Sequence, residues 1–209
     1  MITRTGKRTW RRQLNALENW FCSTGFWQRL TRDRLLPWIV GGNSLGDHVL
    51  ELGAGPGAGT EALRRLAPRV TSLEWSHDFA VDLAAKNHNA VVQGDAAALP
   101  FADRTFSSAI AVLMLHHLRT RAAQESAFRE TFRVLRPGGS LLAFEIEDNL
   151  LHRVIHIGSV FVPIDRADIA DRLSAVGFSR VKLDSRVGGF RFSATRAELI
   201  ASSVPRDVA

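Results

Sequence analysis

The sequence predicts an α/β fold: a Rossmann-like, doubly wound, mostly parallel sheet of seven strands with an antiparallel C-terminal hairpin strand and an N-terminal helical cap. Three observations predict it. From residue 48 onward, short apolar segments alternate with amphipathic segments of helical period. A glycine-rich loop directly follows the first apolar segment. Near the C-terminus, two alternating segments flank the sequence VGG, which predicts a hairpin and therefore at least one antiparallel strand.

Residues 1–44 are predicted to form a basic helical cap, and residues 45–209 the main domain. Apolar side chains recur at helical spacing from about residue 9, and the sequence Ser-Thr-Gly at 23–25 interrupts them. A second helix is predicted from residue 26 towards residue 36. It should end before Pro37, because proline lacks the N–H that a helix interior needs.

The main domain is predicted to alternate strands with helices, each bounded by local signals. Ser76 is a candidate N-cap, and Pro137 and Gly177 stop two of the helices. The predicted strands are 48–52, 69–75, 90–95, 106–115, 140–146, 179–186 and 190–196. The predicted helices are 60–66, 77–87, 121–135 and 165–176.

The charge of the chain is concentrated at its front. Of its 209 residues, the first 38 hold eight basic and two acidic side chains, which accounts for the whole formal net charge of +6. Cys22 is the only cysteine, which excludes an intrachain disulfide and a cysteine-based zinc site. No apolar stretch approaches the ~20 residues of a membrane span, and no apolar core follows the basic N-terminus. These features predict a cytoplasmic protein.

The glycine loop predicts a cofactor site. Gly53, Gly55, Gly57 and Gly59 follow the first strand, and a helix begins directly after them. Glycine lets the backbone approach a ligand closely, and the N-terminus of a helix offers free N–H groups. In open α/β sheets such ligands bind at the carboxyl ends of the strands. The loop also satisfies a loose dinucleotide pattern, so it predicts a nucleotide-type cofactor without naming it.

Three carboxylates narrow the choice of cofactor. Glu51, two residues before Gly53, suits a cofactor with positive charge better than a pyrophosphate. Glu74, about 20 residues past the glycines, is placed to accept hydrogen bonds from ribose hydroxyls. Asp95 follows the third strand, where a carboxylate can accept from an adenine amino group.

Four segments in this order resemble the class I S-adenosylmethionine-dependent methyltransferases of the small-molecule branch. They are ELGAGPG, LEWS, GDAAALPFADRTFSSAIAVLMLHHL and FRVLRPGGSLLAFE, and the resemblance covers about residues 45–146. The whole chain is similar to a bacterial group of these enzymes. The resemblance implies S-adenosyl-L-methionine as cofactor and S-adenosyl-L-homocysteine as product. The cofactor-binding residues that it implies are Glu51, Gly53, Ala54, Gly55, Gly57, Glu74, Trp75, Gly94, Asp95 and Ala96.

The resemblance also implies a role for each part of that set. Glu51 and the backbone of residues 53–57 would hold the methionine part. Glu74 would bind the ribose, Trp75 would flank the adenine, and Asp95 with Ala96 would recognise the adenine edge. Each residue has a structural alternative: Glu51 could cap the following helix, Trp75 could serve packing alone, and Asp95 could be a turn residue.

Methyl transfer requires a nucleophile aligned with the C–S bond and, for a neutral acceptor, removal of a proton. The candidate catalytic side chains are His116, His117 and Glu145, which follow the fourth and fifth strands. The histidines could instead cap or pack, and Glu145 could be a solvated strand end. His152 and His156 have the i, i+4 spacing of metal ligands, but no Glu or Cys completes a motif, so no metal is predicted.

The predicted acceptor is a small molecule or a lipid-like molecule. The fourth strand ends in AVLMLHH and lacks the Asn/Asp-Pro-Pro-Tyr/Phe motif of enzymes that methylate flipped bases, which speaks against nucleic acid. Three hypotheses remain for the basic cap. In the leading hypothesis the cap forms a wall of the substrate pocket. In the other two it binds an anionic membrane or nucleic acid. The rival functions are an RNA or protein methyltransferase, a non-catalytic cofactor-binding scaffold and, more distantly, a nicotinamide oxidoreductase.

Overall fold

The computed structural model describes residues 15–86, 90–186 and 188–198. Predictions that concern residues 1–14, among them the start of the first helix and five of the eight basic side chains of the cap, lie outside the described residues, as does Val187 in the predicted hairpin turn. Within the described ranges, no helix is both long and apolar enough to cross a membrane.

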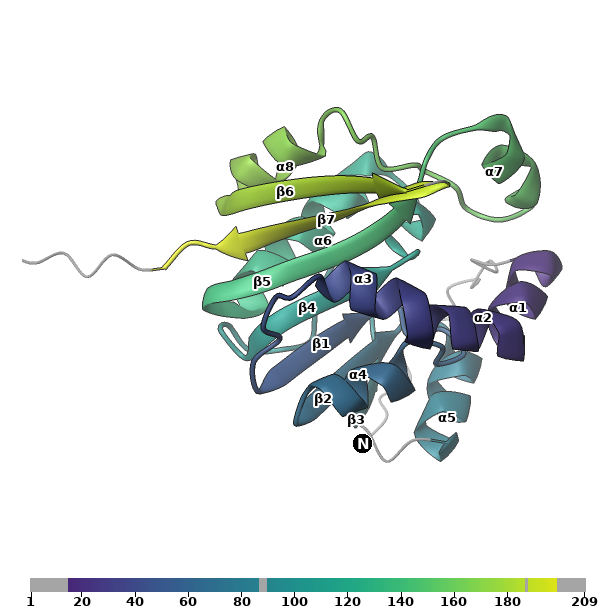
Figure 1. Cartoon of the computed structure of the whole chain (residues 1–209), viewed down its shortest axis with the longest axis horizontal. Coiled ribbons are helices and arrows are strands. Elements are labelled where there is room, and N and C mark those ends of the chain that lie inside the picture. The colour runs from purple at the N-terminus through teal and green to yellow at the C-terminus, as the bar shows by residue number, and fades with distance from the viewer. Residues whose placement is uncertain (1–14, 87–89, 187, 199–209) are drawn as a thin grey trace, which may run out of the picture.

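The strands of the described chain form one seven-stranded sheet in the order β3-β2-β1-β4-β5-β7-β6 (Figure 1). The pairs β2–β3, β1–β2, β1–β4 and β4–β5 are parallel, and β7 is antiparallel to both of its neighbours. The strand order reverses between β1 and β4, which is where such folds bind ligands. The predicted fold class is confirmed. The strands are β1 (His48–Leu52), β2 (Arg69–Glu74), β3 (Ala90–Gln93), β4 (Phe106–Val112), β5 (Leu135–Ile146), β6 (Phe178–Arg186) and β7 (Gly189–Arg196).

The helices of the described chain cover both faces of the sheet and its carboxyl edge. In Figure 1, α3 and α4 lie in front of the sheet and α6 and α8 behind it, while α1 and α7 lie at the end towards which β1 points. The helices are α1 (Ala16–Ser23), α2 (Gly25–Leu30), α3 (Leu36–Val40), α4 (Thr60–Leu66), α5 (His77–Lys86), α6 (Arg121–Val134), α7 (Leu150–Ile155) and α8 (Ile169–Val176). A π-helix, η1 (Thr31–Leu35), joins α2 to α3, and a short 3₁₀ helix, η2 (Leu115–His117), follows β4.

Two apolar clusters hold these layers together. The larger one packs β-strand side chains such as Leu50 and Phe106 against Phe128 of α6 and Leu173 of α8. The other packs the opposite face of the sheet against α3 and α4. Leu36 and Ile39 of the predicted cap belong to that second cluster, so the last turn of the cap is part of the sheet's own core. The domain boundary at residue 44 therefore remains a prediction.

The prediction that the second helix ends before Pro37 is wrong. The helical path continues from α2 through η1 and α3 to Val40, and Gly41 then ends it in the left-handed conformation. Pro37 lies in the first turn of α3, directly after the wider π-helical turn of η1. The chain also enters β5 at Leu135, before Pro137, and β4 ends at Val112 rather than at residue 115. Leu113 there has a φ of +53°, which turns the chain out of the sheet.

Candidate functional site

A cavity of about 1240 Å³ lies at the carboxyl ends of β1, β2, β3 and β4. Strand-end residues such as Glu51, Glu74 and Val112 line one side, and residues of α1, α2 and η1 line the other. Pockets for one small ligand are commonly about 300–1,000 Å³. The cavity is therefore large enough for a cofactor together with an acceptor.

The glycine loop forms the floor of this cavity. The amides of Gly53 and Ala54 both donate to the carbonyl of Leu73, at 2.9 and 3.2 Å, which ties the loop to the end of β2. Gly53 has a φ of +67°, and a Cβ at this position would meet the Cβ of Met114 at 2.7 Å. Only glycine fits there without displacing a neighbour. Gly57 donates to the carbonyl of Ala54 and closes the turn, and it is not among the residues that line the cavity.

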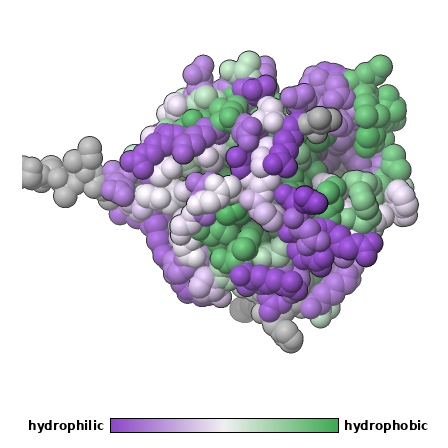
Figure 2. Space-filling view, in the orientation of Figure 1, coloured by the Kyte–Doolittle hydropathy of each residue, from purple (hydrophilic) through white to green (hydrophobic). Residues whose placement is uncertain are grey.

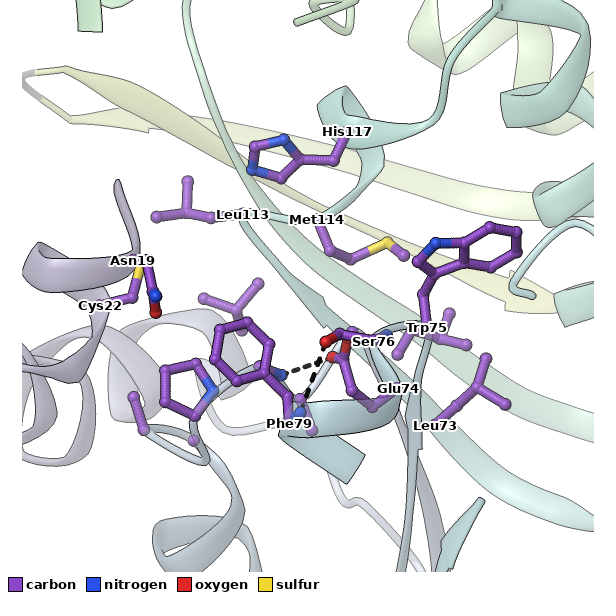
Figure 3. Close-up of a pocket in the computed structure, with 18 of the residues that line it drawn as sticks. Asn19, Cys22, Leu73, Glu74, Trp75, Ser76, Phe79, Leu113, Met114 and His117 are labelled. Atoms are coloured by element: carbon purple, nitrogen blue, oxygen red, sulfur yellow. Dashed lines mark hydrogen bonds between the residues drawn. The ribbon is translucent and has the colours of Figure 1, made fainter. Parts of the chain in front are cut away.

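Glu74 ends β2 and is held by two backbone donors. The amide of Gly55 donates to its Oε2 and the amide of Ser76 to its Oε1, each at 2.7 Å (Figure 3). Burial raises the pKa of Glu74, and the two backbone hydrogen bonds oppose that rise. A carboxylate oxygen can accept more than one hydrogen bond, so both oxygens retain capacity for a ligand hydroxyl. This geometry fits the ribose-binding role that the resemblance implies.

Glu51 is almost fully buried at the end of β1, yet it lines the cavity. Its Oε2 accepts from the hydroxyls of Thr60 and Ser72, both at 2.7 Å. Burial raises the pKa of Glu51, and these two hydroxyls lower it. A buried carboxylate next to an open cavity is stabilised by a cationic ligand, which fits the positively charged end of S-adenosylmethionine.

The predicted adenine-binding residues lie together at the end of β3. Gly94, Asp95 and Ala96 line the cavity, and Trp75 lines it from the end of β2. Asp95 Oδ1 accepts from the Ala97 amide at 2.8 Å, and the Asp95 carbonyl accepts from the Ala98 amide at 3.0 Å. Asp95 thus stabilises the turn in which it lies, which is the structural role considered for it in the sequence analysis. Its place on the cavity wall is equally compatible with binding a ligand.

The cap contributes residues that sequence analysis did not single out. Thr31, the first residue of the π-helix η1, lines the cavity and is 1% exposed. Its hydroxyl has no hydrogen-bond partner among the described residues. Such an orphaned buried hydroxyl points to a missing ligand group, and π-helices are frequent at functional sites. The sequence TRDRL resembles ordinary α-helix, so no local signal could have revealed Thr31.

Cys22 also lines the cavity, from α1. Burial, reinforced by the nearby charge of Glu18, raises the pKa of its thiol to about 11. The thiol is therefore protonated and a poor nucleophile at neutral pH.

The three candidate catalytic side chains lie close together but differ in access to the cavity. His117 lines it, on the side away from Glu74 and Phe79 (Figure 3). His116 and Glu145 are fully buried, hydrogen-bonded to each other, and not among the lining residues. Glu145 also accepts from the amides of Met114 and Leu115 at 3.2 and 2.8 Å. Glu145 is therefore not the solvated strand-end residue that the sequence analysis considered as an alternative. It is buried and holds the loop after β4 through these hydrogen bonds.

The electrostatics of this group follow from burial. Burial, with a smaller effect from His156, lowers the pKa of His116 to about 3. Burial and the neighbouring His116 lower the pKa of His117 to about 3. Burial raises the pKa of Glu145 to about 7. Both histidines are consequently neutral at physiological pH, and His117 is a weak base that can accept a hydrogen bond.

Comparison with known proteins agrees with the geometry. Residues 50–143 match the family described as "Methyltransferase domain". A demethylmenaquinone methyltransferase of Corynebacterium kroppenstedtii is 29% identical over 184 residues, which cover 87% of this chain and 75% of that protein. One of Mycobacterium marinum is 38% identical over 125 residues, covering 57% of this chain and 48% of that protein. The chain thus spans about half the length of the mycobacterial relative.

Among solved structures, the N-methyltransferase NodS of Bradyrhizobium japonicum in complex with S-adenosyl-L-homocysteine has the same fold. The TM-score is 0.69 at 17% sequence identity, over 90% of this chain and 96% of that one. The strand order, the glycine loop at the switch point and the matched domain agree with one another. On these grounds residues 50–143 form a methyltransferase domain, and the chain has the fold of S-adenosylmethionine-dependent methyltransferases.

Proposed function

We propose that this chain transfers the methyl group of S-adenosylmethionine to a small, lipid-like acceptor. The observation that supports this most directly is the lining of the cavity. The strand ends bring the carboxylates of Glu51, Glu74 and Asp95 to it. The cap brings Trp20 and Trp27, beside polar side chains such as Asn19. The carboxylates suit the cofactor, and the two tryptophans suit an apolar acceptor.

The reaction would be an in-line displacement at the methyl carbon. The acceptor would form a bond to that carbon as the C–S bond breaks; S-adenosylhomocysteine would leave, and a hydroxyl acceptor would release its proton to solvent. The protein's part is to align the acceptor and to exclude water. His117 would line the acceptor's part of the cavity, with its ring oriented by the hydrogen bond from Nδ1 to the carbonyl of Val160 at 3.0 Å. Glu145 and His116 would be positioning residues, because they act on the loop that bears His117.

Two further observations favour a lipid-like acceptor. Two relatives described above are named demethylmenaquinone methyltransferase. In addition, exposed apolar side chains gather at the end of the molecule where α1 and α7 lie (Figure 2). We call this surface the apolar rim. It consists of Leu17, Trp20, Phe21, Phe26, Leu150, Leu151, Val154 and Ile157.

The apolar rim borders the cavity, because Trp20 belongs to both. Arg29 and Arg34 follow the rim residues of α2 along the same helical segment. Apolar side chains beside basic ones are typical of helices that lie on anionic membranes. We therefore propose that the rim rests on an anionic lipid surface and that the acceptor enters from it.

The first experiment combines binding with transfer. Calorimetry should show that S-adenosylhomocysteine binds and that NAD does not. Purified protein is then incubated with methyl-labelled S-adenosylmethionine and a cell extract, which is afterwards separated into lipid, small-molecule, RNA and protein fractions. We expect the label in the lipid or small-molecule fraction and its loss in Asp95→Ala. Glu61→Gln, an exposed carboxylate on α4, is the matched control.

Other outcomes select among the rival functions. Label confined to RNA or protein would overturn the proposed acceptor class and make the basic cap a polymer-binding surface. Cofactor binding without label in any fraction would favour the non-catalytic scaffold. Sedimentation with vesicles tests the membrane contact separately. Binding should require anionic lipid and fall in Leu150→Ser/Leu151→Ser, and equal binding to neutral vesicles would contradict the charge argument.

A further inference from the structure

Three histidines from two distant parts of the chain meet beside the cavity. His116 and His117 come from η2, after β4, and His156 caps the C-terminus of α7. One ring nitrogen of each lies within 4.8 Å of a ring nitrogen of the other two. His116 and His156 are buried and His117 is half-buried. Two of the three rings are thus shielded from solvent, and His117 can be reached from the cavity.

The hydrogen bonds of the three rings fix which nitrogen is available. Nδ1 of His117 contacts the carbonyl of Val160 at 3.0 Å, and Nδ1 of His156 contacts the carbonyl of His152 at 2.6 Å. A carbonyl can only accept, so both Nδ1 atoms must be protonated. Nδ1 of His116 contacts the carboxylate of Glu145. Nε2 is therefore the atom left for a ligand in His116 and His117, whereas Nε2 of His156 lies 3.0 Å from a carboxylate oxygen of Glu18.

This arrangement is the one found around metal-binding histidines. Such histidines almost always donate their second ring nitrogen to a carboxylate or a backbone carbonyl, which fixes the tautomer and the ring orientation. All three rings of the cluster show that pattern.

A buried carboxylate adjoins the cluster through His156. Glu18 of α1 is 6% exposed, and its Oε1 lies 3.0 Å from Nε2 of His156. Two ligand atoms on one tetrahedral zinc ion are about 3.3 Å apart, given bond lengths of about 2.0–2.2 Å. The Glu18–His156 pair is already near that spacing. The histidine nitrogens would have to approach one another by at most about 1.5 Å.

We propose that His116, His117 and His156, through Nε2, and Glu18, through its carboxylate, bind one divalent transition-metal ion of the zinc class. Three imidazoles with one carboxylate are borderline donors that suit Zn²⁺ rather than Mg²⁺ or Ca²⁺. The ion would join α1, α7 and the loop after β4, and so fasten the cap over the sheet. This revises the sequence-based expectation of no metal, which considered His152 with His156. His152 is not in the cluster, because it is not among the histidines whose ring nitrogens lie within 4.8 Å of one another.

The test measures metal binding by itself, with neither cofactor nor acceptor, so its outcome is independent of the proposed methyl transfer. The full chain is stripped with a chelator and titrated with Zn²⁺ against a chromophoric competitor. We expect one ion per chain. Co²⁺ should give the intense visible absorption of a tetrahedral site. His117→Gln and His156→Gln should each weaken Zn²⁺ binding by about 100-fold or more, since loss of second-shell partners alone costs 10–100-fold.

Control variants separate coordination from folding. His152→Gln, one helical turn from His156, and the exposed His77→Gln should bind Zn²⁺ as the original chain does. Circular dichroism of the stripped proteins should show that His117→Gln and His156→Gln remain folded; should one of them unfold, the other decides. The proposal is overturned if the stripped chain takes up no stoichiometric Zn²⁺, or if the cluster variants bind Zn²⁺ as tightly as His152→Gln.

Discussion

The amide of Gly55 donates a 2.7 Å hydrogen bond to the carboxylate of Glu74, across 19 residues of sequence. This bond joins the glycine loop after β1 to the end of β2, and the Ser76 amide binds the other oxygen of the same carboxylate. The residue expected to hold the cofactor's ribose thus also sets the shape of the loop expected to hold its methionine part. Binding of the two halves of the cofactor should therefore be coupled through Glu74.

Glu74→Gln should weaken both the loop and the cofactor site. The glutamine side chain has one oxygen and one NH₂ group in place of the two carboxylate oxygens. It can therefore accept from only one of the two backbone amides, Gly55 or Ser76, and the other loses its partner. We expect a loss of about 1–3 kcal/mol in the free energy of unfolding. The affinity for S-adenosylhomocysteine should fall at least tenfold, measured by calorimetry. Glu61→Gln is the control, and equal affinities in the two variants would contradict a ribose-binding role.

Two glycines of the loop should respond differently to alanine. Both have positive φ, so each substitution should cost about 1–2 kcal/mol in backbone strain. At Gly53 the new Cβ would also overlap Met114, whereas at Gly55 it would meet nothing within 4 Å. We expect Gly53→Ala to be less stable than Gly55→Ala by about 1 kcal/mol or more in urea denaturation. Equal losses would mean that Met114 moves aside freely.

Thr31→Val should separate stability from ligand binding. Valine has nearly the same shape as threonine and removes the buried hydroxyl that has no partner among the described residues. The free energy of unfolding should stay constant or rise by up to about 1 kcal/mol. If the hydroxyl serves the cofactor, the affinity for S-adenosylhomocysteine should fall by about fivefold to tenfold. Unchanged affinity together with raised stability would mean that Thr31 does not contact the cofactor.

Glu51 should make stability depend on pH. Burial raises its pKa in the folded state above the ordinary 4.5, so the folded chain retains a proton that the unfolded chain has released. Below pH 4.5 this carboxyl is protonated in both states and does not lower the free energy of unfolding. As the pH rises towards the raised pKa, only the unfolded chain releases the proton, so the free energy of unfolding falls. In Glu51→Gln this loss is absent, so the stability of the variant relative to the original chain should increase with pH above 4.5. Urea denaturation across that range measures it, and a constant difference would contradict the raised pKa.

Local sequence determined the elements that carry the cofactor site. β1 and α4 have the predicted bounds, because an apolar run, a glycine cluster and an amphipathic segment each have signals within a few residues. The place of Glu51, Glu74 and Asp95 at strand ends followed from the same pattern. Nine of the ten predicted cofactor residues line the cavity, and Gly57 instead closes the turn. Their roles in binding remain predictions.

Tertiary structure decided what depends on contacts between distant segments. The helix passes through Pro37 because η1 and α3 pack Leu36 and Ile39 against the sheet, an advantage that local propensity does not contain. Glu18, His116 and His156 lie far apart in the chain and meet only because α1 and α7 close over the end of β4. Thr31 lines the cavity because the helical segment that bears it packs over the strand ends. Residue spacing in the sequence predicts which side chains are neighbours within one helix or strand. Contacts between distant segments depend on how the elements pack, which the spacing does not contain.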